Sequence, residues 1–122
     1  MKKVKRSPYE LVVISVVVVL ALALSLSLYS SRANYQKGNL MVHELAMMRS
    51  AILLYKNIEK KNPERLNDLV VQDYEVEGLR RPFMDRLPMS RDGVYVDPFG
   101  NPYKYNPDSG WVSSITPGYE RW

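Results

Sequence analysis

The sequence predicts an α+β protein, in which a long N-terminal helix packs on a small antiparallel β-meander. Two observations favour this fold class. An apolar run without charge, Gly or Pro occupies residues 11–28, and apolar residues return at helical spacing from Leu40 onward. The last third consists instead of short aromatic and β-branched stretches divided by Pro, Gly and Asn, as is typical of strands and turns.

The apolar run predicts a membrane-spanning helix. At about 1.5 Å per residue it covers about 27 Å, close to the hydrocarbon thickness of a bilayer. Four basic residues precede it, and positive charge favours the cytoplasmic side: Lys2, Lys3, Lys5 and Arg6. We therefore expect residues 1–30 to form a cytoplasmic tip and a single span of a bacterial inner membrane. Residues 31–122 then form one periplasmic domain.

Composition excludes several function classes. The formal net charge of +4 suggests nucleic acid, but residues beyond Tyr29 carry 13 basic and 12 acidic side chains. The excess thus comes from the N-terminal tip, and no nucleic-acid partner is expected. The chain has no Cys and one His, and it lacks a glycine-rich phosphate loop. We expect neither an enzyme nor a cofactor or metal site, and we interpret His43 beside Met47 as part of a packed helix.

One alternative to a retained anchor is a cleaved secretory signal. Ser31-Arg32-Ala33 after an apolar stretch resembles a small-residue cleavage site. The run is longer than the usual apolar region of a signal, and the helical pattern continues beyond it. These two features favour a retained anchor.

The second half of the long helix is predicted to be amphipathic. An inward stripe follows helical spacing, and a second stripe lies beside it. The first consists of Met41, Leu45, Met48, Ile52 and Tyr55, and the second of Met47, Ala51, Leu54 and Ile58. Charged residues, Glu44 and Arg49 among them, are placed on the other faces. Gly38-Asn39 is a point where the helix is expected to loosen.

Beyond this helix, the sequence predicts short elements. The helix is expected to end at about residue 61, because Asn62 precedes Pro63. Asn62 as N-cap and Pro63 at the first position predict a short helix over 63–71. Residues 72–91 read as a loop, and a meander is expected over about 93–115, with strands at 93–96, 102–105 and 110–115. Three short strands need the helix face to pack on.

A nine-residue motif connects the expected strands. It consists of Asp97, Pro98, Phe99, Gly100, Asn101, Pro102, Tyr103, Lys104 and Tyr105. Pro98 and Gly100 predict a tight turn, and Pro102 fixes the entry of the next strand. Tyr103 and Tyr105 share one face of that strand and are expected to cover the helix.

This motif resembles the Asp-Pro-aromatic-Gly-Asn-Pro-Tyr-x-Tyr stretch of the major pseudopilin of type II secretion. Trp111-Val112-Ser113-Ser114 resembles the last strand of that family, and the layout of the whole chain is similar to the type IV pilin superfamily. The resemblance implies a pilin-like fold and a structural subunit that assembles through its N-terminal helix. The partners it implies are other pilin-like subunits, an inner-membrane assembly platform and the lipid bilayer.

The resemblance also implies an assembly role for Glu10. In the family, the corresponding Glu meets the amino terminus of a neighbouring subunit. Here Lys5 and Arg6 stand where the family has the Gly and Phe of its cleavage site. The usual site is thus absent, and Glu10 is expected to pair with Arg6 or with a basic residue of a neighbour. The acidic calcium-binding loop of the family is not evident, so calcium is not expected.

Two functions remain open at this stage. The chain is either a subunit of a type II secretion pseudopilus or pilus-like filament, or a monomeric membrane-anchored periplasmic adaptor. Ser15, Ser25 and Ser27 lie in the apolar run, where hydroxyl groups can bond between neighbouring helices.

Overall fold

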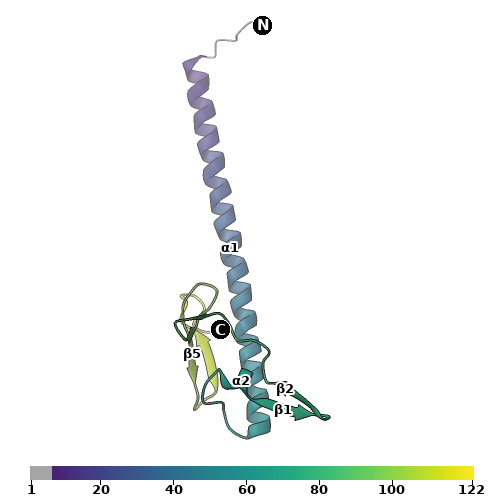
Figure 1. Ribbon diagram of the computed structural model, residues 1–122. Helices are drawn as coiled ribbons and strands as arrows, with labels where there is room; N and C mark the ends of the chain where they lie inside the picture. Colours follow the sequence, from purple (N-terminus) through teal and green to yellow (C-terminus); the bar gives the residue numbers. More distant parts are fainter. Residues whose placement is uncertain (1–6) are drawn as a thin grey trace. The chain divides into compact units, whose positions relative to one another are not determined.

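The computed structural model describes residues 7–122, and Figure 1 shows their order. Two helices and six strands follow one another along the chain: α1 (Pro8–Glu59), α2 (Asp68–Val71), β1 (Asp73–Val76), β2 (Leu79–Pro82), β3 (Ser90–Arg91), β4 (Val94–Tyr95), β5 (Tyr103–Asn106) and β6 (Trp111–Ser114). The chain divides into two units, Met1–Gln36 and Lys37–Trp122, and α1 contributes to both. We call the second unit the head. This α+β layout is the one predicted, although the unit boundary lies a few residues beyond residue 30.

The first unit holds the apolar half of α1. None of the side chains in its most apolar 18-residue window is buried within the protein, and the helix is long and apolar enough to cross a membrane. The helix starts where a capping residue and a proline predict it. The Glu10 amide donates to the Ser7 hydroxyl at 3.3 Å, and Pro8 occupies the first helical position.

The serine hydroxyls of this half bond within their own helix. Ser15 donates to the Leu11 carbonyl and Ser25 to the Ala21 carbonyl, both at 2.8 Å. Each hydroxyl proton is thus already used one turn back, as is common for Ser in apolar helices. The expected role of Ser15 and Ser25 as donors between helices therefore has no support here. Association of this segment would depend on the shape of its apolar surface.

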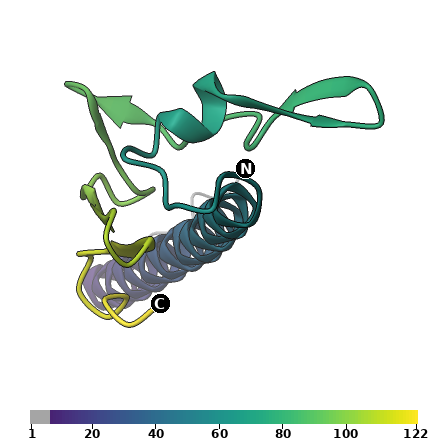
Figure 2. The ribbon, with the colours of Figure 1, turned by 90° about the horizontal axis from the view of Figure 1, so that it is seen from below.

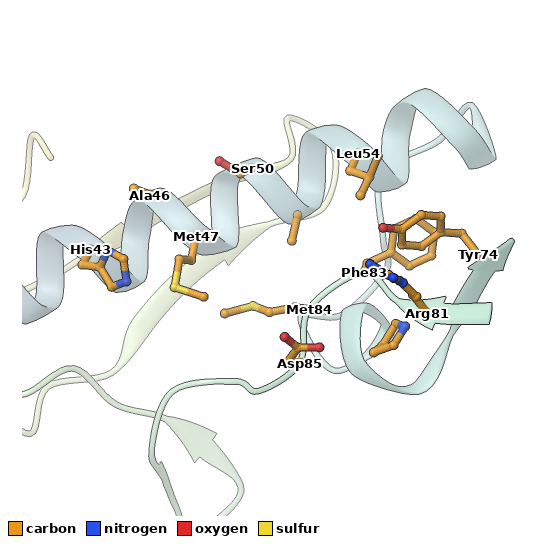
Figure 3. A pocket seen from close by; sticks show the side chains of 12 residues that line it. His43, Ala46, Met47, Ser50, Leu54, Tyr74, Arg81, Phe83, Met84 and Asp85 are labelled. Atoms are coloured by element: carbon orange, nitrogen blue, oxygen red, sulfur yellow. The ribbon is translucent and has the colours of Figure 1, made fainter. Parts of the chain in front are cut away.

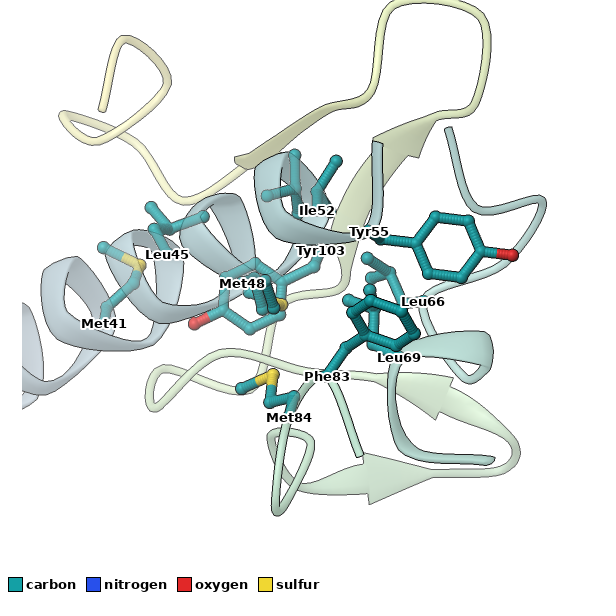
Figure 4. Close-up of a cluster of buried hydrophobic side chains, with 12 residues drawn as sticks. Met41, Leu45, Met48, Ile52, Tyr55, Leu66, Leu69, Phe83, Met84 and Tyr103 are labelled. Carbon is teal, nitrogen blue, oxygen red and sulfur yellow. The ribbon is translucent and has the colours of Figure 1, made fainter. Parts of the chain in front are cut away.

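The core of the head is built on the inward stripe of α1. Met41, Leu45, Met48, Ile52 and Tyr55 are all buried, which confirms the helical spacing predicted for them. Figure 4 shows this stripe facing Leu66, Leu69, Phe83, Met84 and Tyr103 from the rest of the head. Burying such side chains contributes about 1.5–3 kcal/mol each.

The second stripe is covered only in part. Ala51 is buried and Leu54 is half-buried, whereas Met47 and Ile58 are each about two-fifths exposed. One side of α1 within the head therefore presents apolar side chains that no other part of the described chain covers.

The region between α1 and α2 differs from the expectation. The helix ends at Glu59, and Lys60 adopts a left-handed conformation with φ 61°. The short helix expected over 63–71 is wrong at its start, because α2 begins only at Asp68. The Asn62 side chain does not cap a helix. It donates instead to the carbonyls of Pro107 and Asp108, at 2.9 and 3.0 Å, and thereby ties the end of α1 to the β5–β6 turn.

The strands pair as three antiparallel hairpins, so the meander expected over 93–115 is confirmed only in part: its last two strands pair as β5 and β6, whereas its first strand meets the second only through one isolated bridge. β3 pairs with β4, β5 pairs with β6, and one isolated bridge, Val96 to Pro102, connects the two regions. The hairpin of β1 and β2 occupies a stretch expected to be a loop. Its turn uses Glu77 at φ 50° and Gly78 at φ 80°, a two-residue turn that suits the twist of paired strands.

Gly38 is a packing position, and the loosening expected at Gly38-Asn39 does not occur. α1 continues through both residues, and Gly38 is buried. A Cβ added there would meet the Tyr119 hydroxyl at 2.3 Å. The missing side chain therefore lets Tyr119, near the end of the chain, lie directly against the helix.

Candidate functional site

The motif around Asp97 forms a hydrogen-bond network in the head. Asp97 is 3% exposed, and its carboxylate accepts four hydrogen bonds. The amides of Phe99 and Asn101 donate to Oδ1 at 2.9 and 3.0 Å. The hydroxyls of Ser114, at 2.7 Å, and Thr116 donate to Oδ2. Each carboxylate oxygen is thus satisfied, and the turn is fastened to the strand end at 114–116.

The same hydrogen bonds determine the ionisation of Asp97. Burial alone raises the pKa of this carboxyl, but the four donors stabilise the charged form and together lower the pKa below its ordinary value. A carboxylate held in this way is fully occupied by its own chain. These bonds fasten the turn to the strand end, which is the role of a fold element.

The two tyrosines of the motif contact the helix and its end. The Tyr103 hydroxyl donates to Glu44 Oε2 on α1 at 2.6 Å, and the Tyr105 hydroxyl donates to the Pro63 carbonyl at 2.6 Å. Burial, and then the bond to Glu44, raise the pKa of Tyr103 far above its ordinary value. Both rings cover the α1 region, as the sequence predicts. Glu44, however, faces the head, where an outward position was expected.

The remaining motif residues shape the turn. Gly100 has φ 87°, a conformation that favours glycine, and Pro102 forms the bridge to Val96. Pro98 is half-buried. The Phe99 ring lies 5.6 Å from that of Tyr119, and the Lys37 ammonium lies 5.9 Å from the Phe99 centroid. The Asn101 side-chain amide donates to the Thr116 hydroxyl at 2.8 Å and so joins the hydrogen-bond network around Asp97.

Arg49 is a structural residue that sequence reasoning missed. It was placed on an outer face, yet its guanidinium donates to the Val112 carbonyl at 2.9 and 3.2 Å and to the Trp122 carbonyl. It also lies 4.0 Å from the centre of the Trp111 ring. Partial burial lowers the pKa of Arg49. A cation over an aromatic ring leaves no periodic signal in a sequence, so no pattern could have located this contact.

The proposed assembly pair of Glu10 and Arg6 is described only at Glu10, because Arg6 lies outside residues 7–122. Glu10 is exposed in the first turn of α1, three residues after Ser7. Ser-x-x-Glu at a helix start is a capping-box spacing, and the structure shows its first half, the bond from the Glu10 amide to Ser7. The backbone amide of Glu10 thus takes part in the start of the helix, and the Glu10 side chain is exposed.

A large hollow of the head lies beside the second stripe of α1. Leu40, His43, Glu44 and Met47 of α1 form one wall, and residues 84–89 form the other. This hollow, which we call the methionine groove, has a volume of about 700 Å³. It adjoins a second hollow of about 500 Å³ under the β1–β2 hairpin. Met47 and Met84 line both hollows, and Figure 3 shows their side chains pointing toward each other.

The groove offers apolar contact rather than a set of metal ligands. Within residues 7–122 no three His, Asp or Glu side chains gather closely enough to hold a metal ion. Methionine side chains adapt easily to the shape of a partner and are frequent on binding surfaces.

No family model, curated protein or solved structure matches this chain.

Proposed function

We propose that the chain is a structural subunit of a type II secretion pseudopilus or a pilus-like filament, anchored and assembled by the apolar half of α1. One observation carries this proposal. A single helix supplies both an apolar, entirely uncovered segment at residues 11–28 and the central core element of a small head. A segment of this kind is stable only in lipid or against other apolar helices.

The proposal includes a membrane topology for the chain. The basic tip lies in the cytoplasm of a bacterium, residues 11–28 cross the inner membrane, and the head lies in the periplasm. The helix runs without interruption through Ser31-Arg32-Ala33, which supports a retained anchor over a cleaved signal. The role is structural rather than catalytic, and the partners are further pilin-like subunits and an assembly platform in the membrane.

Cysteine cross-linking in membranes tests the proposal, because the natural chain has no Cys. Single cysteines are introduced one at a time along residues 11–28, and oxidised membranes are examined for disulfide-linked dimers. A filament predicts strong dimers at positions that repeat every three to four residues, as expected where helices pack face to face. Lys104→Cys, on an exposed part of β5, serves as the control for random collision.

The adaptor alternative predicts a different result. A monomeric anchored protein gives dimers at the same low level along the whole segment as at Lys104→Cys. A second test concerns the exposed carboxylate at the start of α1. Glu10→Gln keeps the helix start and removes the charge, so it should reduce the yield of dimers while membrane insertion stays intact. Unchanged dimer yield would remove the assembly role of Glu10.

A further inference from the structure

The β1–β2 hairpin projects from the head and carries an uncovered apolar tip. Figure 2 shows the hairpin extending away from the other elements of the head. Val76 and Leu79 are direct partners in the ladder, so their side chains share one face, and they are 50% and 57% exposed. The tight turn of Glu77 and Gly78 holds this pair in place.

The base of the hairpin packs on the core of its own head. This base is fixed, because the Tyr74 ring lies 4.9 Å from Phe83, and Phe83 in turn lies 4.8 Å from Tyr55 in the core. Tyr74 and Arg81 line the hollow next to α1, and the tip lies two residues further out. An apolar pair held outward on a braced hairpin is a surface that suits another molecule.

The methionine groove is the surface of the head that matches this tip. Leu40, Met47 and Met89 line it and are 51%, 42% and 75% exposed, so the groove presents uncovered apolar side chains. Its volume of about 700 Å³ is that of a hollow large enough to receive a small group of side chains. Two aliphatic side chains on a narrow turn are a suitable occupant for a hollow of this size.

Both surfaces carry charged side chains of both signs, so opposite charges are available to pair across a contact between them. In the hairpin, Glu75 and Glu77 flank Val76, while Arg80 follows Leu79. In the groove, Arg86 and Asp85 stand side by side on the exposed wall. Glu77 opposite Arg86 and Arg80 opposite Asp85 would form two pairs of opposite charge across a contact between the tip and the groove. The other carboxylate of the groove, Glu44, already accepts the Tyr103 hydroxyl.

We propose that the β1–β2 hairpin tip of one copy docks into the methionine groove of the next copy. This inference rests on the proposed filament function and deepens it, since it identifies which surfaces of neighbouring heads meet. The tip and the groove are different surfaces of one head, so the contact is heterologous. Each added copy leaves one tip and one groove free, and such contacts continue into open helical assemblies.

Mixed cysteine cross-linking tests the contact in full-length chains. Leu79→Cys and Met89→Cys chains carry different tags, are inserted together into liposomes and are oxidised. The proposal predicts that disulfides between position 79 of one chain and position 89 of the other dominate, with few like-with-like pairs. Lys104→Cys, which lines neither surface, replaces either variant as the control and should give at least tenfold less mixed product.

Charge exchange tests the orientation of the docked tip. Glu77→Arg alone and Arg86→Glu alone should each lower the yield of the 79–89 disulfide about tenfold, a factor that corresponds to 1.4 kcal/mol. The two changes, one in each partner chain, should restore most of the yield at low salt. Both residues are exposed, and the tryptophan fluorescence of the head serves to verify that each variant is folded.

Several outcomes would overturn the inference. These are 79–79 or 89–89 pairs alone, and no recovery in the charge exchange. Absence of the 79–89 pair while cysteines in residues 11–28 still form periodic dimers would reject this contact and leave the filament function standing. Absence of both kinds of cross-link would reject the contact and the filament function together.

Discussion

Replacing Asp97 gives the sharpest stability prediction, because one carboxylate serves four donors. Asp97→Ala removes the acceptor of two backbone amides, those of Phe99 and Asn101. A buried donor without a partner costs about 1–3 kcal/mol. Since both amides are only partly buried, we expect a loss of about 2–4 kcal/mol in the free energy of unfolding of the head. That is a large share of the roughly 5–15 kcal/mol typical of a small domain.

Asp97→Asn should be milder. The amide oxygen still accepts from the two backbone amides, whereas the amide nitrogen replaces the oxygen that receives the Ser114 and Thr116 hydroxyls. These hydroxyls must turn, and the charge-assisted part of the bonds is lost. We expect a cost of about 1–2 kcal/mol.

The assay is urea unfolding of the detergent-solubilised full chain, followed by tryptophan fluorescence, since both tryptophans lie in the head. Asp108→Asn is the matched control, because Asp108 is exposed and its side chain holds no comparable network; it should change the free energy by less than about 0.5 kcal/mol. An Asp97→Ala head as stable as the Asp108→Asn head would refute the reasoning.

The pH dependence of the same chain follows from the lowered pKa of Asp97. A carboxyl whose pKa is lower in the folded than in the unfolded state stabilises the fold above its unfolded pKa, about 3.9. This stabilisation is lost as the pH falls below about 4, through the folded pKa. The natural head should therefore lose more stability between pH 5 and 3 than Asp97→Asn does. Equal losses in the two chains would contradict a lowered pKa.

Two further predictions concern glycines, and thermal unfolding measures both. Gly93→Ala, where φ is 79° and no atom lies within 4 Å of the added Cβ, should cost about 1–2 kcal/mol. Gly110→Ala has a similar φ of 70° but also places a Cβ 2.8 Å from Asn62 Oδ1, so it should cost clearly more stability. Equal costs would show that the contact with Asn62 does not constrain Gly110. Gly38→Ala displaces Tyr119, and it should therefore raise stability by about 1 kcal/mol in a Tyr119→Ala background but by less in the natural chain. An equal gain in both backgrounds would show that the tyrosine does not rest on the helix.

The long helix and its inward stripe could be predicted because they leave a periodic signal. Met41, Leu45, Met48 and Ile52 recur at helical spacing, and burial of one face is what selects that spacing. The tight turn at Gly100 was predictable for a similar reason, since turn residues act through local backbone preferences. Signals of this kind depend only on near neighbours in the chain.

The hairpin of β1 and β2 was not predicted, because few of its side chains are buried. Strand patterns are recognised when one face is apolar, but in this projecting hairpin most strand residues are exposed and half of them are charged. The available signal was Glu77-Gly78 between Val76 and Leu79, a turn pair flanked by aliphatic residues. Weighing that signal above the surrounding charge would have found the hairpin.

Long-range polar contacts could not be predicted at all. Asn62 was assigned to a helix cap on local grounds, yet it bonds the β5–β6 turn about 45 residues away. Arg49 was placed outward because charged side chains usually face water, yet it bonds the carbonyl of Val112. For both residues the tertiary partner outweighs the local preference, and no local pattern in the sequence indicates which distant residue will be that partner.

The central claim is that the apolar half of α1 stays joined to the head that the same helix supports. The intact mass of the protein extracted from membranes tests this most directly. The account predicts a single membrane-bound species that retains residues 11–28 in full. A mature species that begins at Asn34 and is released from the membrane would contradict it.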